Sequence, residues 1–254
     1  MKFKFLCLAA ASLSILNSCK KDDTVVSGQK GNVAVEFQNY VGSQPLSVSV
    51  TGFPYVNANG DSFSVSTYKY YVSNLKFVNS NGTEYAVPES YYLIDTENPS
   101  SFSFSISNVP AGTYTAIKVL LGVDSIRNVS GAQTGALDPM HGMFWTWNTG
   151  YIMAKVEGTS PQSSTADGKL SFHLGGYSGP LNVLREVTIT LPQQLVVGNN
   201  STSKVTFKSD VLKWFESPNL IKFGELSQVN SPGKAASTLA DNFSNSLTVS
   251  HVQN

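Results

Sequence analysis

Apolar and polar residues alternate with a period of two along most of the chain after residue 32. Such alternation places apolar side chains on one face of a strand and polar side chains on the other. It predicts strands around five apolar sets, namely Val33/Val35/Phe37, Leu46/Val48/Val50, Leu75/Phe77, Phe102/Phe104/Ile106 and Val187/Ile189/Leu191. Half-buried strands of this kind favour an all-β fold, and we expect an antiparallel β-sandwich that spans residues 33–254 as one domain.

Turn residues separate these strands, and helix is scarce. Asn81-Gly82 predicts a hairpin, and Pro110-Ala111-Gly112 predicts a second turn. Two short helices are expected near the C-terminus, one around residues 211–215 and one from Ala236 to Phe243, where apolar residues recur at helical spacing. The Ser-, Thr- and Gly-rich stretch from Glu157 to Lys169 indicates a loop.

The N-terminus has the pattern of a lipoprotein export signal. Lys2 and Lys4 precede an apolar run that is too short to span a bilayer, and the run ends in Leu16-Asn17-Ser18-Cys19. We therefore expect residues 1–18 to be a signal peptide, Cys19 to carry lipid that binds the membrane, and residues 19–32 to form a flexible tether. The alternative is an ordinary signal peptide with an accidental cysteine.

Lys20-Lys21-Asp22-Asp23 follow Cys19 directly. This charged tetrad resembles the export tags of Bacteroidota lipoproteins, which implies an outer-membrane or cell-surface location. A solvated tether without a sorting role is the alternative.

Composition excludes several classes of function. Lys and Arg total 17 and Asp and Glu total 17, with only 13% of residues charged, so a basic nucleic-acid-binding surface is not expected. The only cysteines are Cys7 and Cys19, so the folded domain has no disulfide. No nucleophile elbow, phosphate-binding loop or zinc-protease helix is present, and we expect no enzymatic activity.

The three histidines are the candidate metal ligands, because imidazole binds copper well. In Leu170-Ser171-Phe172-His173-Leu174-Gly175, alternation places His173 on the face opposite the three apolar residues, exposed either to solvent or to a ligand. His141 shares one face with Met143, Trp145 and Trp147 if its segment is extended; otherwise it is a loop residue. His251 shares a face with Leu247 and Val249, which favours a partly buried structural role over a ligand role.

Four segments occur in an order that resembles the MbnP-like copper-binding domain family, in particular its Bacteroidota lipoprotein branch. They are Leu121-Gly122-Val123-Asp124-Ser125, Gly135-Ala136-Leu137-Asp138-Pro139, the run from Met143 to Tyr151 with its Trp-x-Trp-x-x-Gly-Tyr pattern, and Phe172-His173-Leu174-Gly175. The resemblance implies a secreted or surface β-sandwich that holds copper through histidine imidazoles beside a tryptophan oxidised to kynurenine. It further implies a di-haem partner of the MauG type that oxidises this tryptophan.

Transferred by motif, the resemblance makes His173 the first ligand candidate and Trp145 or Trp147 the tryptophan that is modified or forms a wall of the site. Relatives with copper commonly carry an Asn-His pair before the tryptophan motif, whereas this chain has Asn128-Val129. His141 or His251 is then the candidate for a second imidazole.

Three functions remain open from the sequence. The first is a lipid-anchored copper-binding or copper-handling protein. The second is a surface module that binds glycans or proteins without metal, with Trp145, Trp147, Tyr151 and Tyr177 as a stacking platform. The third is a structural lipoprotein without a small ligand. Converging imidazoles favour the first, and exposed tryptophans with scattered histidines favour the second.

Overall fold

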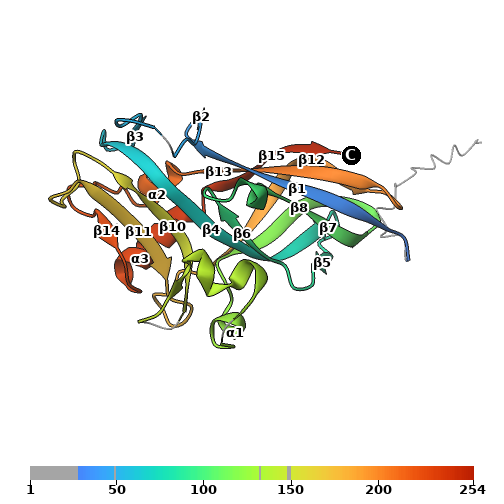
Figure 1. The fold of residues 1–254 in the computed structure, drawn as a ribbon. Coiled ribbons are helices and arrows are strands. Elements are labelled where there is room, and N and C mark those ends of the chain that lie inside the picture. The colour runs from blue at the N-terminus through green and yellow to red at the C-terminus, as the bar shows by residue number, and fades with distance from the viewer. Residues whose placement is uncertain (1–27, 49, 132, 148–149) are drawn as a thin grey trace, which may run out of the picture.

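A computed structural model describes residues 28–48, 50–131, 133–147 and 150–254, and these form two packed β-sheets (Figure 1). The predicted signal peptide, the lipidation site at Cys19 and most of the predicted tether lie outside the described residues. No helix in the described ranges is long and apolar enough to cross a membrane.

The smaller sheet contains both ends of the described chain. Its strands run in the order β15, β13, β1, β2, and β7 also pairs with β1. Their bounds are Leu247–Gln253 for β15, Thr202–Asp210 for β13, Lys30–Val41 for β1, Gln44–Pro45 for β2 and Ser103–Pro110 for β7.

The larger sheet carries the candidate site. Its main path runs β12, β8, β4, β10, β11, β14, while β3, β5 and β6 pair with β4 and β9 pairs with β10. The main strands are β12 (Arg185–Val197), β8 (Gly112–Leu121), β4 (Ser62–Asn79), β10 (Gly150–Thr159), β11 (Lys169–Gly175) and β14 (Gln228–Val229). The short ones are β3 (Tyr55–Val56), β5 (Glu84–Ala86), β6 (Tyr91–Asp95) and β9 (Phe144–Trp145).

Apolar side chains from both sheets meet in one aromatic core. Phe37 of β1 and Phe207 of β13 stack with ring centroids 4.8 Å apart, and Phe37 contacts Tyr70 of β4 edge to face. Alternation explains this packing, because Val33, Val35 and Phe37 are all buried while the residues between them are partly exposed. The predicted β-sandwich is confirmed.

Two details of the strand prediction are wrong. The sheets are mixed rather than wholly antiparallel, because β1 pairs in parallel with β13 and β11 pairs in parallel with β14. The set Leu46/Val48/Val50 does not form a strand; β2 ends at Pro45, and Leu46 and Val48 pack on the core from an irregular segment.

Both predicted C-terminal helices are present, as α2 (Lys213–Glu216) and α3 (Lys234–Phe243). Ala236, Leu239, Ala240 and Phe243 are the buried positions of α3, as the spacing predicts. The remaining helical turns are α1 (Ser125–Asn128) and three 3-10 turns, η1 (Pro99–Phe102), η2 (Gly135–Leu137) and η3 (Pro139–His141).

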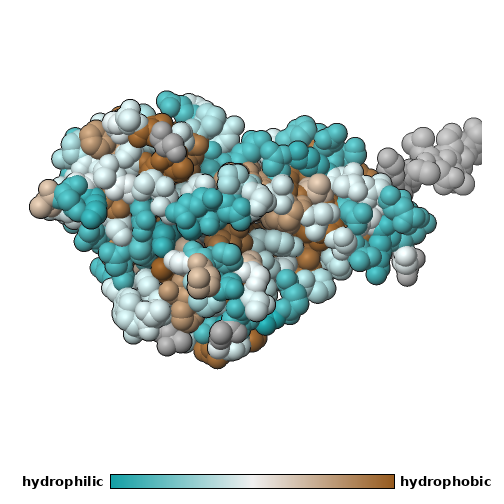
Figure 2. Space-filling model, in the orientation of Figure 1, coloured by the Kyte–Doolittle hydropathy of each residue, from teal (hydrophilic) through white to brown (hydrophobic). Residues whose placement is uncertain are grey.

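The segment from residue 122 to 147 covers one end of the larger sheet. Tyr71 of β4 and Tyr151 of β10 point into this segment and contact each other edge to face, and the Tyr151 hydroxyl donates a hydrogen bond to the Leu137 carbonyl. Where this segment no longer covers it, the same face of the sheet carries polar side chains. Figure 2 shows hydrophilic residues over much of the visible surface, with apolar ones in scattered patches.

Candidate functional site

Polar side chains form a two-row grid on the outer face of β4, β10 and β11, which we call the polar face. Strand register places Lys69, Lys155 and His173 in one row, and Thr67, Glu157 and Ser171 in the next. Each strand alternates, so the residues between them point into the core; Val156 and Phe172, for example, are buried. The polar face thus follows directly from the period-two pattern.

His173 is held on this face by a carboxylate. Its Nε2 lies 2.7 Å from Glu157 Oε1, and the His173 side chain is 16% exposed. The hydrogen bond from His173 lowers the pKa of Glu157, an effect that burial opposes and that Lys155 strengthens. An ionised carboxylate only accepts hydrogen bonds, so Nε2 carries the proton, and in the neutral ring Nδ1 keeps the lone pair.

Trp145 packs over Gly175, two residues along β11 from His173. A Cβ atom on Gly175 would lie 2.2 Å from Trp145 Cζ3, so the indole packs directly over this glycine. Residues 173 and 175 share one face of a strand, which puts the indole one step along β11 from the imidazole. Trp145 itself is only 6% exposed.

Trp147 is far more exposed to solvent than Trp145. It is 64% exposed, and its ring centroid lies 5.3 Å from that of Trp145 at an angle of 39°. Trp145 is therefore buried over β11, while its neighbour Trp147 reaches solvent.

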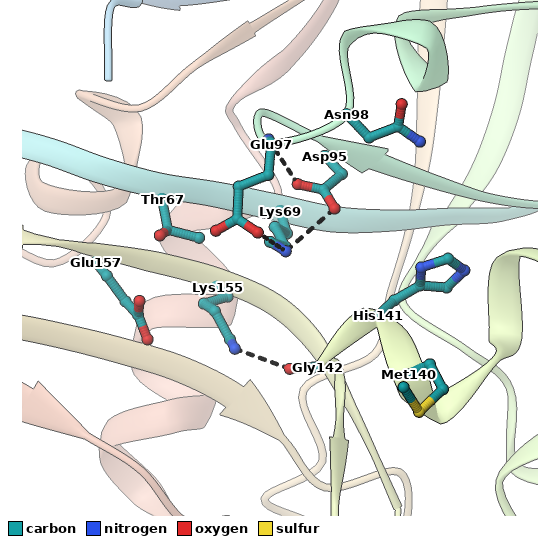
Figure 3. Close-up of a pocket in the computed structure, with 10 residues that line it drawn as sticks. All are labelled: Thr67, Lys69, Asp95, Glu97, Asn98, Met140, His141, Gly142, Lys155 and Glu157. Atoms are coloured by element: carbon teal, nitrogen blue, oxygen red, sulfur yellow. Dashed lines mark hydrogen bonds and ion pairs between the residues drawn. The ribbon is translucent and has the colours of Figure 1, made fainter. Parts of the chain in front are cut away.

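A cavity of about 510 Å³ opens over the polar face (Figure 3). Its floor contains Thr67, Lys69, Lys155 and Glu157. Its rim comes from two segments, the turn after β6 with Asp95, Glu97 and Asn98, and the η3 turn with Met140, His141 and Gly142.

The ion pairs of the cavity hold its floor to its rim. Lys69 Nζ lies 2.7 Å from Glu97 Oε2 and 3.1 Å from Asp95 Oδ2. Burial alone would lower the pKa of Lys69, but the hydrogen bonds to Glu97 and Asp95 outweigh it and raise this pKa. Lys155 Nζ donates to the Gly142 carbonyl at 2.8 Å, which ties the η3 turn to β10.

His141 stands on the rim, on the opposite side of the cavity from Glu157 (Figure 3). The expectation of an extended segment is wrong here. Asp138 caps the η3 turn by accepting a hydrogen bond from Met140 N, and Gly142 ends the turn in the left-handed region at φ 69°. His141 is therefore exposed while Met143 and Trp145 are buried, and its Nε2 lies 2.9 Å from the Gly135 carbonyl.

His251 lies in the other sheet, on β15. Of the three histidines only His141 lines the cavity; His173 reaches it through its contact with Glu157, and His251 has no contact with it. The expected partly buried position is also wrong. Thr206 pairs with His251 but Phe207 pairs with Val249, so a β-bulge shifts the alternation by one residue. Leu247, Val249 and Val252 are buried, and His251 is exposed.

These donors are a partial fit to copper. Within the part of the chain that the structure describes, no group of three or more His, Cys, Asp or Glu side chains is close enough to hold a metal ion. The polar face supplies one imidazole oriented by a carboxylate, and the cavity rim supplies a second imidazole at a distance. His173 and Glu157 thus provide one oriented metal ligand, and the described residues do not complete the coordination of a metal ion around it.

Sequence reasoning missed the partners of the predicted residues. Glu157, Lys155 and Lys69 were not predicted as site residues, because their importance depends on which strands are neighbours. The predicted loop from Glu157 to Lys169 is also too long, since β10 continues to Thr159 and β11 begins at Lys169. The alternation of Ala154, Lys155, Val156 and Glu157 carried a usable signal, since it sets two charged residues on the outer face of a strand otherwise buried.

A family model described as MbnP matches residues 30–233. The chain belongs to the MbnP family. Among solved structures, MbnP from Methylosinus trichosporium is similar, with 16% sequence identity and a TM-score of 0.48 over 82% of this chain and 83% of that one. No curated protein matches the chain. The MbnP family is associated with copper binding, so membership supports a copper-related role.

Proposed function

We propose that this MbnP-family chain is a lipid-anchored copper-binding or copper-handling protein, and that His173 is its first metal ligand. The observation that carries the proposal is the contact between His173 and Glu157 on β11 and β10, with the indole of Trp145 packed over Gly175 of the same strand. Copper supplies an electrophilic centre that neutral imidazole nitrogen binds strongly.

Glu157 prepares His173 for that role. By accepting a hydrogen bond from Nε2–H, the carboxylate fixes the ring tautomer and raises the basicity of the remaining nitrogen, Nδ1. Metal-binding histidines in proteins commonly have such a carboxylate partner on the nitrogen that does not face the metal.

His141 is the second imidazole of the proposal. The Gly135 carbonyl accepts from its Nε2, which leaves Nδ1 as the metal-binding nitrogen on the cavity rim. Met140, next to it, is 89% exposed and adds a thioether, a donor that suits Cu(I). His251 has no part in this proposal, because β15 belongs to the other sheet.

Trp145 is the proposed site-wall tryptophan and the proposed target of oxidation by a di-haem MauG-type partner. An intact indole has an N–H donor and no lone pair for a metal, so it serves as a wall until its ring is opened. Trp147 contacts Trp145 and is exposed, which makes it the neighbour that such a partner would meet first. Intact mass of the protein from its native host tests whether either tryptophan is ring-opened.

The proposed location is the outer membrane or cell surface, with a Bacteroidota lipoprotein signal and a lipid on Cys19. The support is the Leu16-Asn17-Ser18-Cys19 sequence followed by the charged tetrad.

Copper titration of metal-free protein, prepared without a histidine tag, tests the ligand assignment. We expect His173→Ala to weaken copper affinity by about a hundredfold, since the best ligand is removed, and His141→Ala to weaken it by about tenfold. His251→Ala is the matched control, an exposed histidine in the other sheet, and should bind copper as the unsubstituted chain does. Equal affinity in the His173→Ala and His251→Ala variants would overturn the assignment.

The exposure of Trp147 favours one alternative, a glycan- or protein-binding module without metal. A copper-free unsubstituted protein that binds an oligosaccharide, with binding lost in Trp147→Ala, would support this function in place of the first.

A further inference from the structure

The smaller sheet has a gap along the edge of β1 that pairs with both β7 and β2. β7 pairs with β1 as far as Glu36 with Ser103, and β2 pairs with it from Tyr40 with Pro45. Neither strand pairs with residues 37–39. A cavity of about 570 Å³ opens at this gap, and we call it the gap cavity.

The charged groups of the gap cavity neutralise each other. Among the described residues that line it, Glu36 is the one carboxylate and Lys204 the one ammonium, and the two form an ion pair. Hydrogen bonds from Lys204 and from Gln38 Nε2 lower the pKa of Glu36. A charged ligand would therefore lose hydration here without meeting an unpaired opposite charge.

The lining has hydrogen-bonding groups to spare. Within the described part of the chain, Gln38 Oε1, Ser103 Oγ and the Tyr40 hydroxyl have no hydrogen-bond partner. An amide oxygen accepts, whereas a hydroxyl both donates and accepts. These groups match a ligand that offers donors and acceptors together.

Apolar side chains supply the rest of the lining. Phe102 and Tyr40 are half-buried, and Pro45 is exposed. Lys208 Nζ lies 4.5 Å from the centroid of the Tyr40 ring and occupies one face of it, so Phe102 is the ring without a cation over it. The C–H groups of a sugar ring pack favourably on apolar and aromatic side chains of this kind.

We propose that the gap cavity binds the ring of a neutral saccharide, with hydroxyls bonded to Gln38 and Ser103 and a C–H face against Phe102. The paired charges select a neutral ligand, and the spare donors and acceptors select hydroxyl groups. The volume suits a small molecule.

This site goes beyond the proposed function and does not depend on copper, since it lies in the other sheet from His173 and His141 is on the rim of a different cavity. Its test uses metal-free protein in the presence of a chelator. Failure of copper binding and failure of saccharide binding are then separate results.

The probes are the methyl glycosides of glucose, galactose and mannose, titrated one at a time, and the readout is the NMR shift of the Gln38 and Ser103 amides. We expect at least one glycoside to shift both amides saturably, while the amides of Gly142 and Lys155 in the other cavity stay unchanged. No saturable shift with any of the three would overturn the proposal. Tighter binding of charged glucosamine or glucuronate than of the neutral glycosides would overturn the neutral ligand.

Variants test which groups hold the sugar. Gln38→Ala should weaken binding about fivefold, because a hydrogen bond is lost, and Phe102→Leu, which keeps an apolar side chain, should also weaken it. Gln194→Ala is the matched control, since Gln194 is an exposed glutamine of β12 outside the gap cavity. Equal affinity of Gln38→Ala and Gln194→Ala would overturn the proposal, as would binding that is lost only in Trp147→Ala.

Two sources can supply such a ring, a free sugar or the end of a glycan. A methyl glycoside has a blocked anomeric position, as a glycan end has. Binding of the glycoside at least as tight as that of the free sugar identifies a glycan end, and tighter binding of the free sugar identifies a monosaccharide.

Discussion

At the scale of single residues, the Glu157–His173 pair links the stability of the polar face to pH. The hydrogen bond from His173 favours the ionised form of Glu157, so the folded state holds this carboxylate at a pKa below its ordinary value of 4.5. A lowered pKa means that the pair stabilises the fold fully above the ordinary value. The stabilisation is lost as the pH falls through the lower, folded-state pKa.

Glu157→Gln should therefore reduce the free energy of unfolding at neutral pH by about 1 kcal/mol, a value discounted for the partial exposure of the pair. The difference from the unsubstituted chain should shrink in acid, where Glu157 is protonated in both states. Urea unfolding followed across the acid range measures it. Glu225→Gln, at an exposed surface ion pair, is the control, and equal pH profiles for the two variants would contradict the account.

The sequence predicted the direction of His173 but not its partner. Alternation along Leu170, Phe172 and Leu174 fixes the face of one strand, and burial of these three residues confirms that assignment. Glu157 lies on a different strand, and register between strands is set by bulges and turns that alternation does not encode. For the same reason a single bulge in β15 reverses the expected exposure of His251.

At the scale of elements, turns and helices with a strong local sequence signal were predicted correctly. Segments in which two local signals compete were not. The turn at Asn81-Gly82 and the apolar face of α3 depend on neighbours in sequence, and both were predicted. The segment from Asp138 to Tyr151 has alternating apolar residues, yet the Asp138 cap and the left-handed Gly142 favour a 3-10 turn at its start. Local capping outweighed periodicity there.

Packing of β9 against β11 depends on the absence of a side chain at residue 175. Gly175→Ala would place a Cβ 2.2 Å from Trp145 Cζ3, so we expect a loss of about 1–3 kcal/mol in unfolding free energy from overpacking. Gly224→Ala is the control, because its nearest atom would be the Gln162 carbonyl oxygen at an ordinary 3.6 Å. Urea unfolding followed by tryptophan fluorescence compares the two, and equal stability would show that Trp145 does not pack over residue 175.

At the scale of the whole molecule, the two sheets join segments that are distant in sequence. β1 pairs in parallel with β13 over nine residue pairs, from Asn32 with Thr202 to Tyr40 with Asp210. Composition and periodicity predict a sandwich, but they do not identify β13 as the strand that pairs with β1. The two strands are about 170 residues apart in sequence. The polar face of the larger sheet lies at a distance in sequence from the proposed lipid at Cys19.

Lipid anchoring is tested by phase partition of the whole protein. The unsubstituted chain expressed with its N-terminal segment should partition into the detergent phase of Triton X-114, and Cys19→Ser should move it to the aqueous phase. Cys7→Ser, within the predicted signal peptide, should not change the partition. Equal partition of the Cys19→Ser and Cys7→Ser variants would contradict the lipid anchor. A separate experiment, protease treatment of intact cells, reports whether the domain is displayed on the outer surface.

The central claim is that His173 binds copper on the polar face. Pulsed electron paramagnetic resonance of Cu(II)-loaded protein tests it most directly, because the remote nitrogen of a bound imidazole modulates the electron spin echo. The account predicts modulation from two imidazoles in the unsubstituted protein and in His251→Ala, reduced to one in His173→Ala. An echo from His173→Ala identical to that of the unsubstituted protein would contradict it.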